Sequence, residues 1–363
     1  MRIIITGGGT GGHLFPGIAL ADSLRQRFPD CEIMFIGTKR QLDQKVLAEQ
    51  NFRQESISCM GLKGMGWSHR LKSLASLPQA VLEAWRIIKA FKPQLVFGVG
   101  GYVTGPVLLA ARLQGIPTCI HEQNSIPGLA NRMIARFAKR IFVSIPGDYP
   151  FPLGKTVVAG NPVRQEIIAA AAERRDKKIE EPLTLLIMGG SLGAHRINLL
   201  MLDALEIIKE KSAVALKLIH QTGAADEEQV RAAYLAAGVE AEVGAFFKDM
   251  DRVYAQADLA VARAGATSLA ELSVMGLPAL LIPYPYATDD HQAKNAQFYV
   301  AEGGAEMYRE AELDAGVLAS AIMNVLSKRK KMEQMGAAMR KMSRPAAAEQ
   351  ILNNCMELIA DRF

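Results

Sequence analysis

The residues between positions 263 and 271 combine groups that could hold a phosphate and a ribose. Gly265 follows a short apolar run and would allow an abrupt turn, because glycine adopts backbone angles closed to other residues. Thr267 and Ser268 could then cap a new helix with their hydroxyl groups. A helix N-terminus attracts anions, and Glu271, one turn inside the helix, could accept two hydrogen bonds from a ribose. The same residues would also fit an ordinary turn with a solvated glutamate.

Two glycine-rich turns add further candidate chemistry. The first, Gly7-Gly8-Gly9-Thr10-Gly11-Gly12-His13, offers an open floor of backbone N–H groups after a strand. His13 at its exit could be a general base, since imidazole is neutral near pH 7, or it could cap the helix start. The second turn, from Gly189 to Ala194, places Ser191 where a diphosphate could bind at a helix N-terminus. The guanidinium of Arg164 could bind the same diphosphate, or Arg164 could be a surface arginine.

The first turn also satisfies the GxGxxG signature of nicotinamide and flavin enzymes. That signature requires an acidic residue at the end of the second strand to hold the ribose. Here the second strand ends Phe35-Ile36-Gly37-Thr38-Lys39 without a carboxylate, although Lys39 and Arg40 could meet the 2′-phosphate of NADP. The sequence therefore does not favour a dinucleotide cofactor.

The sequence predicts no metal site. Its six histidines show no HxxxH spacing, and its four cysteines form no CxxC pair, which indicates reduced core cysteines in a cytosolic protein. Asp249-Met250-Asp251 has the DxD form that holds Mg²⁺ in some nucleotide-sugar enzymes. A helix start is favoured there, so we interpret both aspartates as N-terminal helix charges. No GxSxG segment supports a Ser-His-Asp nucleophile.

The elements that must position these residues belong to a chain large enough for two domains. It has 363 residues, of which 50% are hydrophobic and 22% charged, so a large core is available and global disorder is excluded. The net charge of +5 permits an anionic partner without choosing among nucleotide, lipid and nucleic acid. Met1 runs directly into a strand, so no signal peptide is expected, and no apolar run reaches the ~18 residues of a spanning helix.

Strands and helices alternate along the sequence. Strands are predicted at residues 2–5, 32–36, 53–58, 94–99, 117–122 and 140–143, and helices at 15–27, 41–50, 71–91 and near 128–138. After a charged linker from Glu173 to Pro182, the pattern restarts with strands at 183–188, 215–220, 240–243, 258–262 and 279–282. Two series of βα units predict an α/β protein with two Rossmann-like domains and parallel sheets. The predicted domains are 1–162 and 163–344, followed by a segment 345–363 whose helix could pack back on the first domain.

Several segments occur in an order that is familiar from one enzyme family. They are Gly8–His13, Gly98–Tyr102, His121–Asn124 with Pro127-Gly128, Gly160–Arg164, Gly189–Ser191 and Arg263–Glu271. Over nearly its whole length the chain resembles the MurG family, the undecaprenyl-diphospho-muramoylpentapeptide β-N-acetylglucosaminyltransferases of bacterial cell-wall synthesis. The resemblance implies the GT-B fold, in which two Rossmann-like domains face each other across a cleft and the C-terminal one mainly binds the donor.

The resemblance also implies the residues of the site. His13 is similar to the histidine proposed as the base in that family. The implied donor-binding residues are Thr10, Gly11, Gly12, Asn124, Arg164, Ser191, Phe247, Ala266, Thr267, Ser268, Leu269, Ala270, Glu271 and Gln292. Of these, Asn124 and Gln292 would meet the sugar, Arg164 and Ser191 the diphosphate, Phe247 the uracil through its main chain, and Glu271 the ribose. His291 departs from the two adjacent glutamines of many members, which leaves the finer sugar contacts open.

The implied reaction is an inverting transfer of N-acetylglucosamine from UDP-GlcNAc to the 4-hydroxyl of MurNAc-pentapeptide-diphospho-undecaprenol, without metal or cofactor and without nucleic acid. A lipid-linked acceptor implies a peripheral protein at the cytoplasmic face of the plasma (inner) membrane. The residues expected to meet its anionic surface are Lys63, Met65, Trp67, Arg70, Leu71 and Lys72, which would also fit a solvated loop before a core helix. A UDP-GlcNAc 2-epimerase of the same fold and a non-catalytic nucleotide-sugar-binding scaffold remain open alternatives.

Overall fold

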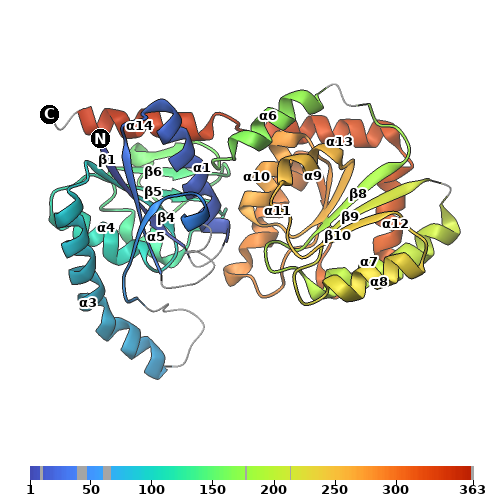
Figure 1. Ribbon diagram of the computed structural model, residues 1–363, viewed down its shortest axis with the longest axis horizontal. Coiled ribbons are helices and arrows are strands. Elements are labelled where there is room, and N and C mark those ends of the chain that lie inside the picture. Colours follow the sequence, from blue (N-terminus) through green and yellow to red (C-terminus); the bar gives the residue numbers. More distant parts are fainter. Residues whose placement is uncertain (9–10, 39–46, 60–66, 176–177, 213, 361–363) are drawn as a thin grey trace. The chain divides into compact units, whose positions relative to one another are not determined.

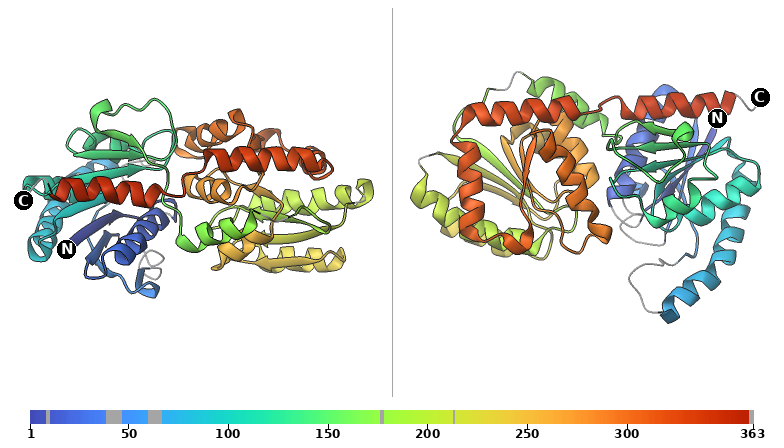
Figure 2. Two further views of the ribbon diagram at one scale, coloured as in Figure 1. Left: turned by 90° about the horizontal axis from the view of Figure 1, so that it is seen from above. Right: turned by 180° about the vertical axis from the view of Figure 1, so that it is seen from behind.

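The computed structural model describes residues 1–8, 11–38, 47–59, 67–175, 178–212 and 214–360, and for residues 67–75 it describes the backbone alone. The chain divides into two compact units (Figure 1). Unit 1 consists of Met1–Arg164 together with the chain from Pro345 onward, and unit 2 of Gln165–Arg344. Each unit contains one parallel sheet with helices on both faces, which confirms the predicted α/β class (Figure 2).

The described residues of unit 1 form a seven-stranded parallel sheet in the order β3-β2-β1-β4-β5-β6-β7. Its strands are β1 (Arg2–Gly7), β2 (Glu32–Gly37), β3 (Arg53–Ser56), β4 (Leu95–Gly100), β5 (Thr118–Glu122), β6 (Arg140–Val143) and β7 (Thr156–Val158). The central strands are continuous buried runs because helices cover both faces of the sheet. The strand order reverses between β1 and β4, and ligands of such sheets bind beyond the carboxyl ends of the strands at this point.

Helices cover the two faces of the unit 1 sheet. They are α1 (Gly11–Arg27), α3 (Trp67–Phe91), α4 (Thr104–Leu113), α5 (Leu129–Ile134) and α14 (Ala347–Ala360), with a 3-10 turn η1 (Leu153–Lys155). One hydrophobic cluster joins α1 and α14 to the sheet through residues such as Leu24 and Ile351. A second cluster joins α3 and α4 to the sheet through residues such as Ile88 and Val107. The last helix of the chain is therefore part of the core of unit 1.

The described residues of unit 2 repeat this layout with six parallel strands in the order β10-β9-β8-β11-β12-β13. The strands are β8 (Leu183–Met188), β9 (Leu216–Gln221), β10 (Ala241–Gly244), β11 (Leu259–Ala262), β12 (Ala279–Leu281) and β13 (Ala305–Met307). The helices are α6 (Gln165–Arg174), α7 (His195–Lys211), α8 (Glu227–Ala236), α9 (Met250–Gln256), α10 (Ala266–Met275), α11 (His291–Ala301), α12 (Ala315–Leu326) and α13 (Arg329–Met342), with 3-10 turns η2 (Thr288–Asp290) and η3 (Glu310–Glu312). Here the order reverses between β8 and β11, so the loops after these strands meet at the carboxyl edge.

The structure differs from the sequence expectation at several boundaries. Helix α1 begins at Gly11 and not at Phe15, although glycine has low helix propensity, so tertiary contacts decide this start. Helix α3 likewise begins at Trp67 and not at residue 71. The predicted helix at 41–50 lies largely outside the described residues. The interpretation of residues 173–182 as a solvated linker is wrong at Arg174, which ends α6 and donates from Nη1 to the carbonyl of Ala255 at 2.7 Å.

Candidate active site

In unit 1 the candidate base lies where the strand order reverses. Strands β1 and β4 end side by side, with Gly7 opposite Gly100. His13 is the third residue of α1, directly after β1. Gly100 has φ +100°, and a Cβ at this position would stand 2.8 Å from His13 Nδ1. The glycine at the end of β4 therefore provides the space that the imidazole ring occupies.

A hydrogen-bonded chain runs from His13 into the core of unit 1. His13 Nδ1 lies 3.1 Å from Gln123 Oε1. Gln123 Nε2 donates to the carbonyl of Val99 at 2.8 Å and lies 3.1 Å from His121 Nδ1. His121 Nε2 lies 3.0 Å from the carbonyl oxygen of Gly160. The partner of His13 Nδ1 is thus a side chain beyond β5, which links the imidazole ring to the sheet.

The loop that carries Asn124 is fixed by the buried carboxylate of Glu122, which is 1% exposed. Glu122 Oε1 accepts hydrogen bonds from the backbone N–H and from Nδ2 of Asn124, at 3.0 and 3.3 Å. Glu122 Oε2 accepts from the backbone N–H of Gly128 and from Nδ2 of Asn131, both at 2.9 Å. These four bonds fold the chain around the carboxylate and hold Asn124 at the carboxyl edge of the sheet.

The remaining unit 1 candidates gather at the beginning of α1. Gly11 and Gly12 are its first two residues, whereas Thr10 lies outside the described residues. Arg164, the last residue of unit 1, is half-buried, and its guanidinium carbon lies 5.5 Å from the centre of the Phe15 ring on α1. A cation over an aromatic face is held favourably, so Phe15 contributes to the placement of Arg164.

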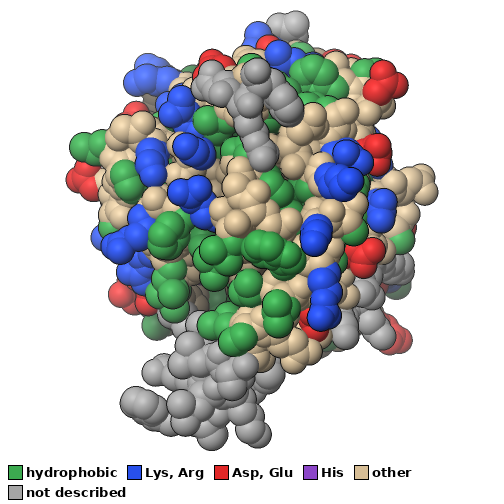
Figure 3. Space-filling model, turned by 90° about the vertical axis from the view of Figure 1, so that its left-hand side faces the viewer, with side chains coloured by type: hydrophobic (Ala, Val, Ile, Leu, Met, Phe, Trp, Pro, Cys, Tyr) green, Lys and Arg blue, Asp and Glu red, His purple; other side chains and the backbone are tan. Residues whose placement is uncertain are grey.

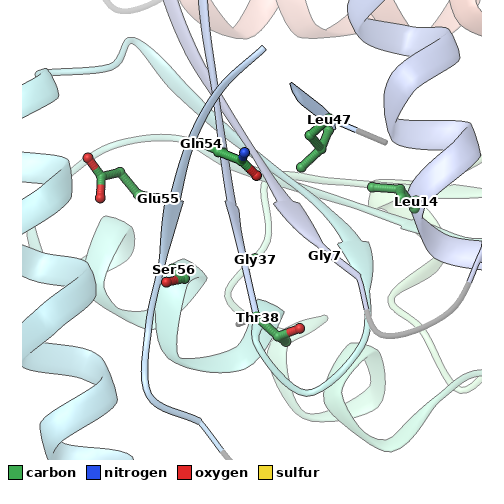
Figure 4. A pocket seen from close by; sticks show the side chains of 8 residues that line it. All are labelled: Gly7, Leu14, Gly37, Thr38, Leu47, Gln54, Glu55 and Ser56. Carbon is green, nitrogen blue, oxygen red and sulfur yellow. The ribbon is translucent and has the colours of Figure 1, made fainter. Parts of the chain in front are cut away.

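A small cavity opens at the carboxyl ends of three neighbouring strands of unit 1 (Figure 4). Its volume is about 110 Å³, and its lining residues are Gly7, Leu14, Gly37, Thr38, Leu47, Gln54, Glu55 and Ser56. Pockets for ligands of drug size usually reach roughly 300 Å³ or more. The cavity is therefore too small to be the site of a nucleotide sugar, and none of the predicted site residues lines it.

In unit 2, α10 begins with its N-terminus at the carboxyl edge of the sheet. Gly265 occupies the N-cap position with φ −69° and ψ 135°, angles that any residue adopts, and as a glycine it has no side chain to cap the helix. The expectation of a special conformation at Gly265 is therefore wrong, and the N-cap position belongs to Gly265 and not to Thr267 or Ser268. Ala266, Thr267 and Ser268 instead form the first turn, whose backbone N–H groups cannot bond within the helix and suit an anion.

Glu271 is buried inside α10, with 6% of its surface exposed. Its Oε2 accepts a hydrogen bond of 2.8 Å from the hydroxyl of Tyr254 on α9, which is fully buried. Leu269 is also fully buried, so only its backbone could contact a ligand, and Ala270 is 9% exposed. The structure thus holds the predicted ribose acceptor in place through a tyrosine from another helix.

The second glycine turn connects to the Phe247 loop through one side chain. Gly190 and Gly193 have φ of +92° and +76°, which bends the chain so that Ser191 stands exposed between them. Gln221 Nε2 donates to the carbonyl of Gly190 at 3.0 Å, and Gln221 Oε1 accepts from the backbone N–H of Phe247 at 3.0 Å. Gln221 therefore joins the second glycine turn to the backbone of the Phe247 loop.

The two aspartates of the DxD segment lie at the start of α9, as the predicted helix start requires. Asp249 precedes the helix and Asp251 belongs to its first turn. A hydrogen bond from Arg252 Nε, 2.5 Å from Asp249 Oδ2, holds the pKa of Asp249 below its usual value. Within the described ranges, no three histidine, cysteine, aspartate or glutamate side chains form a group that could hold a metal ion.

Gln292 lies at the second position of α11. Its Oε1 accepts from the backbone N–H of Tyr284 at 2.9 Å, so the side chain is held through the oxygen of its amide. The buried Arg263 fixes the same loop, because its Nη1 donates to the carbonyl of Ile282 at 3.1 Å and its Nη2 forms an ion pair with Glu310 at 2.5 Å. Arg263 therefore fixes the loop after β12, and the backbone N–H of Tyr284 in this loop holds the side chain of Gln292.

Sequence reasoning missed several of these supporting residues. Gln123, Gln221 and Arg263 follow or end buried strands at the carboxyl edge, and polar residues at such positions were a usable signal. Glu122 belongs to the segment His121–Asn124, but its role as the acceptor for four donors depends on the folded loop. Tyr254 carries no signal in the sequence, since it lies on a helix that packs against α10 only in the fold.

Comparisons with known proteins give a consistent result. Residues 3–143 match the glycosyltransferase family 28 N-terminal domain, and residues 184–351 match the C-terminal domain of that family. Proteins of Desulfotalea psychrophila and Geobacter sulfurreducens are 46% and 44% identical to this chain over 359 and 356 residues. These alignments cover 99% and 97% of this chain and 97% of each relative. Both relatives are named UDP-N-acetylglucosamine–N-acetylmuramyl-(pentapeptide) pyrophosphoryl-undecaprenol N-acetylglucosamine transferase.

Solved structures extend the comparison. MurG of Acinetobacter baumannii superimposes with a TM-score of 0.81 at 31% identity, covering 98% of this chain and 99% of that one. The UDP-GlcNAc 2-epimerase of Neisseria meningitidis, solved with UDP-GlcNAc, gives a TM-score of 0.66 at 14% identity, covering 98% of this chain and all of the epimerase. At this identity the second likeness concerns the fold alone.

Proposed function

The chain belongs to glycosyltransferase family 28, and from this membership we propose its reaction and the residues that perform it. The protein is an N-acetylglucosaminyltransferase of the GT-B fold that moves N-acetylglucosamine from UDP-GlcNAc to N-acetylmuramyl-pentapeptide pyrophosphoryl-undecaprenol. This step converts lipid I to lipid II in peptidoglycan synthesis, on which cell shape and division depend. The observation that carries the proposal is 46% identity to a transferase of this name over 99% of the chain.

The reaction inverts the configuration of the transferred sugar. The Nε2 atom of His13 takes the proton of the acceptor 4-hydroxyl as its oxygen attacks the anomeric carbon from the face opposite UDP. A bond forms between that oxygen and the anomeric carbon while the bond to the β-phosphate breaks, so an α-linked donor gives a β(1→4) disaccharide. The departing UDP carries negative charge, which the N-terminus of α10, the Ser191 turn and Arg164 stabilise.

The other residues bind the donor. Glu271 accepts hydrogen bonds from the ribose, and the carbonyl of Phe247 accepts one from uracil. Gln292 donates through its amide to the hydroxyls of the sugar, and Asn124 contacts the same sugar. Thr10, Gly11 and Gly12 border it from the first glycine turn. The contacts of Glu271, Phe247 and Gln292 described above support these roles, because each side chain or loop is fixed by a partner before the donor binds.

The test of the reaction is the release of UDP from UDP-GlcNAc with and without a lipid-linked MurNAc-pentapeptide. Release that requires the acceptor is expected for the transferase. Release without acceptor, or interconversion of the sugar at carbon 2, would indicate the epimerase that shares this fold. Binding of UDP-GlcNAc with no turnover in either case would indicate a scaffold.

We further propose that the protein binds the cytoplasmic face of the inner membrane as a peripheral protein. None of the helices in the described part of the chain is both long and apolar enough to cross a bilayer. Exposed apolar residues instead recur every fourth position near α4 and α5, and they are Leu109 and Leu113, then Leu129, Met133 and Phe137. Hydrophobic side chains gather on one face of the molecule with lysines and arginines around them (Figure 3).

Charges next to these apolar residues support an anionic lipid surface. Arg112, Arg132 and Arg136 are exposed and each precedes one of the apolar residues in sequence. Apolar insertion and attraction to anionic headgroups act together in interfacial binding. Of the surface predicted from the sequence, Lys63 and Met65 lie outside the described residues, and only the backbone is described at Trp67, Arg70, Leu71 and Lys72.

Sedimentation with lipid vesicles tests the location. Binding is expected to vesicles containing phosphatidylglycerol and to decrease with salt. The variant Met133→Asp/Phe137→Asp should bind at least about tenfold more weakly, since two apolar side chains that would insert into the bilayer are replaced by charged ones. Leu235→Asp, an equally polar change at an exposed leucine of unit 2, is the matched control. Equal binding of both variants would contradict the assignment of this face.

A further inference from the structure

We propose that Gln123 is a positioning residue that holds His13 in the tautomer with the proton on Nδ1, so that Nε2 keeps the lone pair that deprotonates the acceptor. The inference rests on the proposed role of His13 as the base. A neutral imidazole carries its proton on one nitrogen only, and hydrogen-bond partners decide which one.

The orientation of the Gln123 amide is determined by its neighbours. Val99 offers a carbonyl oxygen at 2.8 Å, which can only accept, so the amide NH₂ group must face it. The amide oxygen then faces His13 Nδ1 at 3.1 Å, and an amide oxygen can only accept. His13 Nδ1 must therefore carry the proton. The rotated amide would place two oxygen atoms 2.8 Å apart with no hydrogen between them.

The contacts of His121 lead to the same orientation of the Gln123 amide. Its Nε2 lies 3.0 Å from the carbonyl oxygen of Gly160, so Nε2 carries a proton. Its Nδ1 is then an acceptor, and it lies 3.1 Å from the NH₂ group of Gln123. Burial lowers the pKa of His121 to about 4, which keeps the ring neutral and its Nδ1 free to accept at physiological pH. Two acceptors thus hold the two N–H groups of Gln123, and only its oxygen remains for His13.

The surroundings of His13 agree with this arrangement. Gly100 lies against the same edge of the ring, since a Cβ there would be 2.8 Å from Nδ1 and 2.9 Å from Cε1. The ring edge that contains Nδ1 therefore faces protein, while His13 as a whole is half-buried. When Nε2 takes the acceptor proton, the Nδ1–H bond to Gln123 persists, so the ring keeps its orientation through the reaction.

The first test is a direct measurement on the intact protein. In protein labelled with ¹⁵N-histidine, the ring nitrogens of His13 are assigned by the signals that disappear in His13→Gln. At pH 8 the expected result is a protonated Nδ1 and an unprotonated Nε2. A proton on Nε2 would overturn the proposal, and the kcat of His13→Ala would then decide separately whether His13 takes part in the reaction.

The second test removes the amide. Gln123→Leu is expected to lower kcat roughly 10- to 1,000-fold through the wrong tautomer, with the KM for UDP-GlcNAc nearly unchanged. Its His13 signals should show the Nε2–H form. The matched control is Gln94→Leu, which removes a glutamine bond to the backbone of Arg2 at the opposite end of the sheet and should leave kcat unchanged.

The outcomes separate the two proposals. If His13→Ala lowers kcat only a few-fold, His13 is not the base and the proposed mechanism fails. If His13→Ala lowers kcat strongly but Gln123→Leu keeps full kcat, His13 is still supported as the base and the positioning role of Gln123 is wrong. If Gln123→Leu does not fold, the ¹⁵N measurement on the original protein still decides the tautomer.

Discussion

Replacing Glu271 by alanine tests the donor site most directly. Its carboxylate is buried, and one oxygen already accepts a 2.8 Å hydrogen bond from Tyr254. If the carboxylate also accepts hydrogen bonds from the ribose, Glu271→Ala removes a charged acceptor at which such bonds are strong. We expect UDP binding to weaken by about 1–3 kcal/mol, which is roughly a 5- to 150-fold increase in Kd.

The same substitution also affects the fold. The Tyr254 hydroxyl is fully buried and loses its carboxylate acceptor, which should cost about 1–2 kcal/mol of unfolding free energy. Tyr254→Phe is the matched control, because it deletes this hydrogen bond from the opposite side and leaves the carboxylate in place. Its stability should fall by a similar amount, while its Kd for UDP should stay within about threefold of the original value.

Isothermal titration with UDP and thermal unfolding, both on folded protein, measure the two effects separately. An unchanged Kd for UDP in Glu271→Ala would refute the ribose assignment. Equal weakening in Glu271→Ala and Tyr254→Phe would also refute it, since the loss would then arise from the contact between α9 and α10. Only a loss of affinity confined to the glutamate variant agrees with the proposed role.

Three further predictions concern the supports of the site. Gly100→Ala should lower kcat at least about tenfold in steady-state assays while UDP affinity is kept, because its Cβ would displace the His13 ring and its φ is positive. Gln221→Leu should raise the Kd for UDP roughly 5- to 50-fold in titrations, because the Gly190 turn and the Phe247 loop, both proposed to contact UDP, would lose the side chain that joins them. His121 has its pKa lowered by burial to about 4, so the unfolded chain binds a proton first as pH falls. Unfolding free energy should then drop by about 3 kcal/mol between pH 6.5 and 4, and less in His121→Asn, as measured by denaturant titration.

The fold could be predicted because its signals are local and repeated. Strands of a parallel sheet are buried on both faces, so they read as short hydrophobic runs such as 183–188, which coincides with β8. Strand 140–143 likewise coincides with β6. Helix starts were predicted less well. At α1 the sequence before the helix is rich in glycine, a residue of low helix propensity, so the pattern placed the start at Phe15 although Leu14 is already part of the core.

The candidate site could be predicted only where its residues lie in loops that follow strands or in the first turn of a helix. Ser191, Asn124 and the first turn of α10 have such positions, and the order of the strands then determines which of them come together within each unit. Gly265 shows the limit of reasoning from residue type, because its backbone angles are ordinary and its assumed freedom is not used. The contact between Tyr254 and Glu271 depends on helix packing, which no local pattern indicates.

Both units solve the same positioning problem with a buried glutamine. Gln123 donates to the carbonyl of Val99 at the end of β4, and Gln221 donates to the carbonyl of Gly190 just after β8. Each carbonyl fixes the orientation of its amide, so each amide oxygen accepts from the other neighbour, which is His13 Nδ1 in unit 1 and the backbone N–H of Phe247 in unit 2. In the proposed mechanism this leaves the lone pair of His13 Nε2 for proton transfer in unit 1 and the carbonyl of Phe247 for uracil in unit 2. A neutral amide fulfils both tasks because its donor and acceptor ends are distinct and it adds no charge beside a reacting phosphate ester.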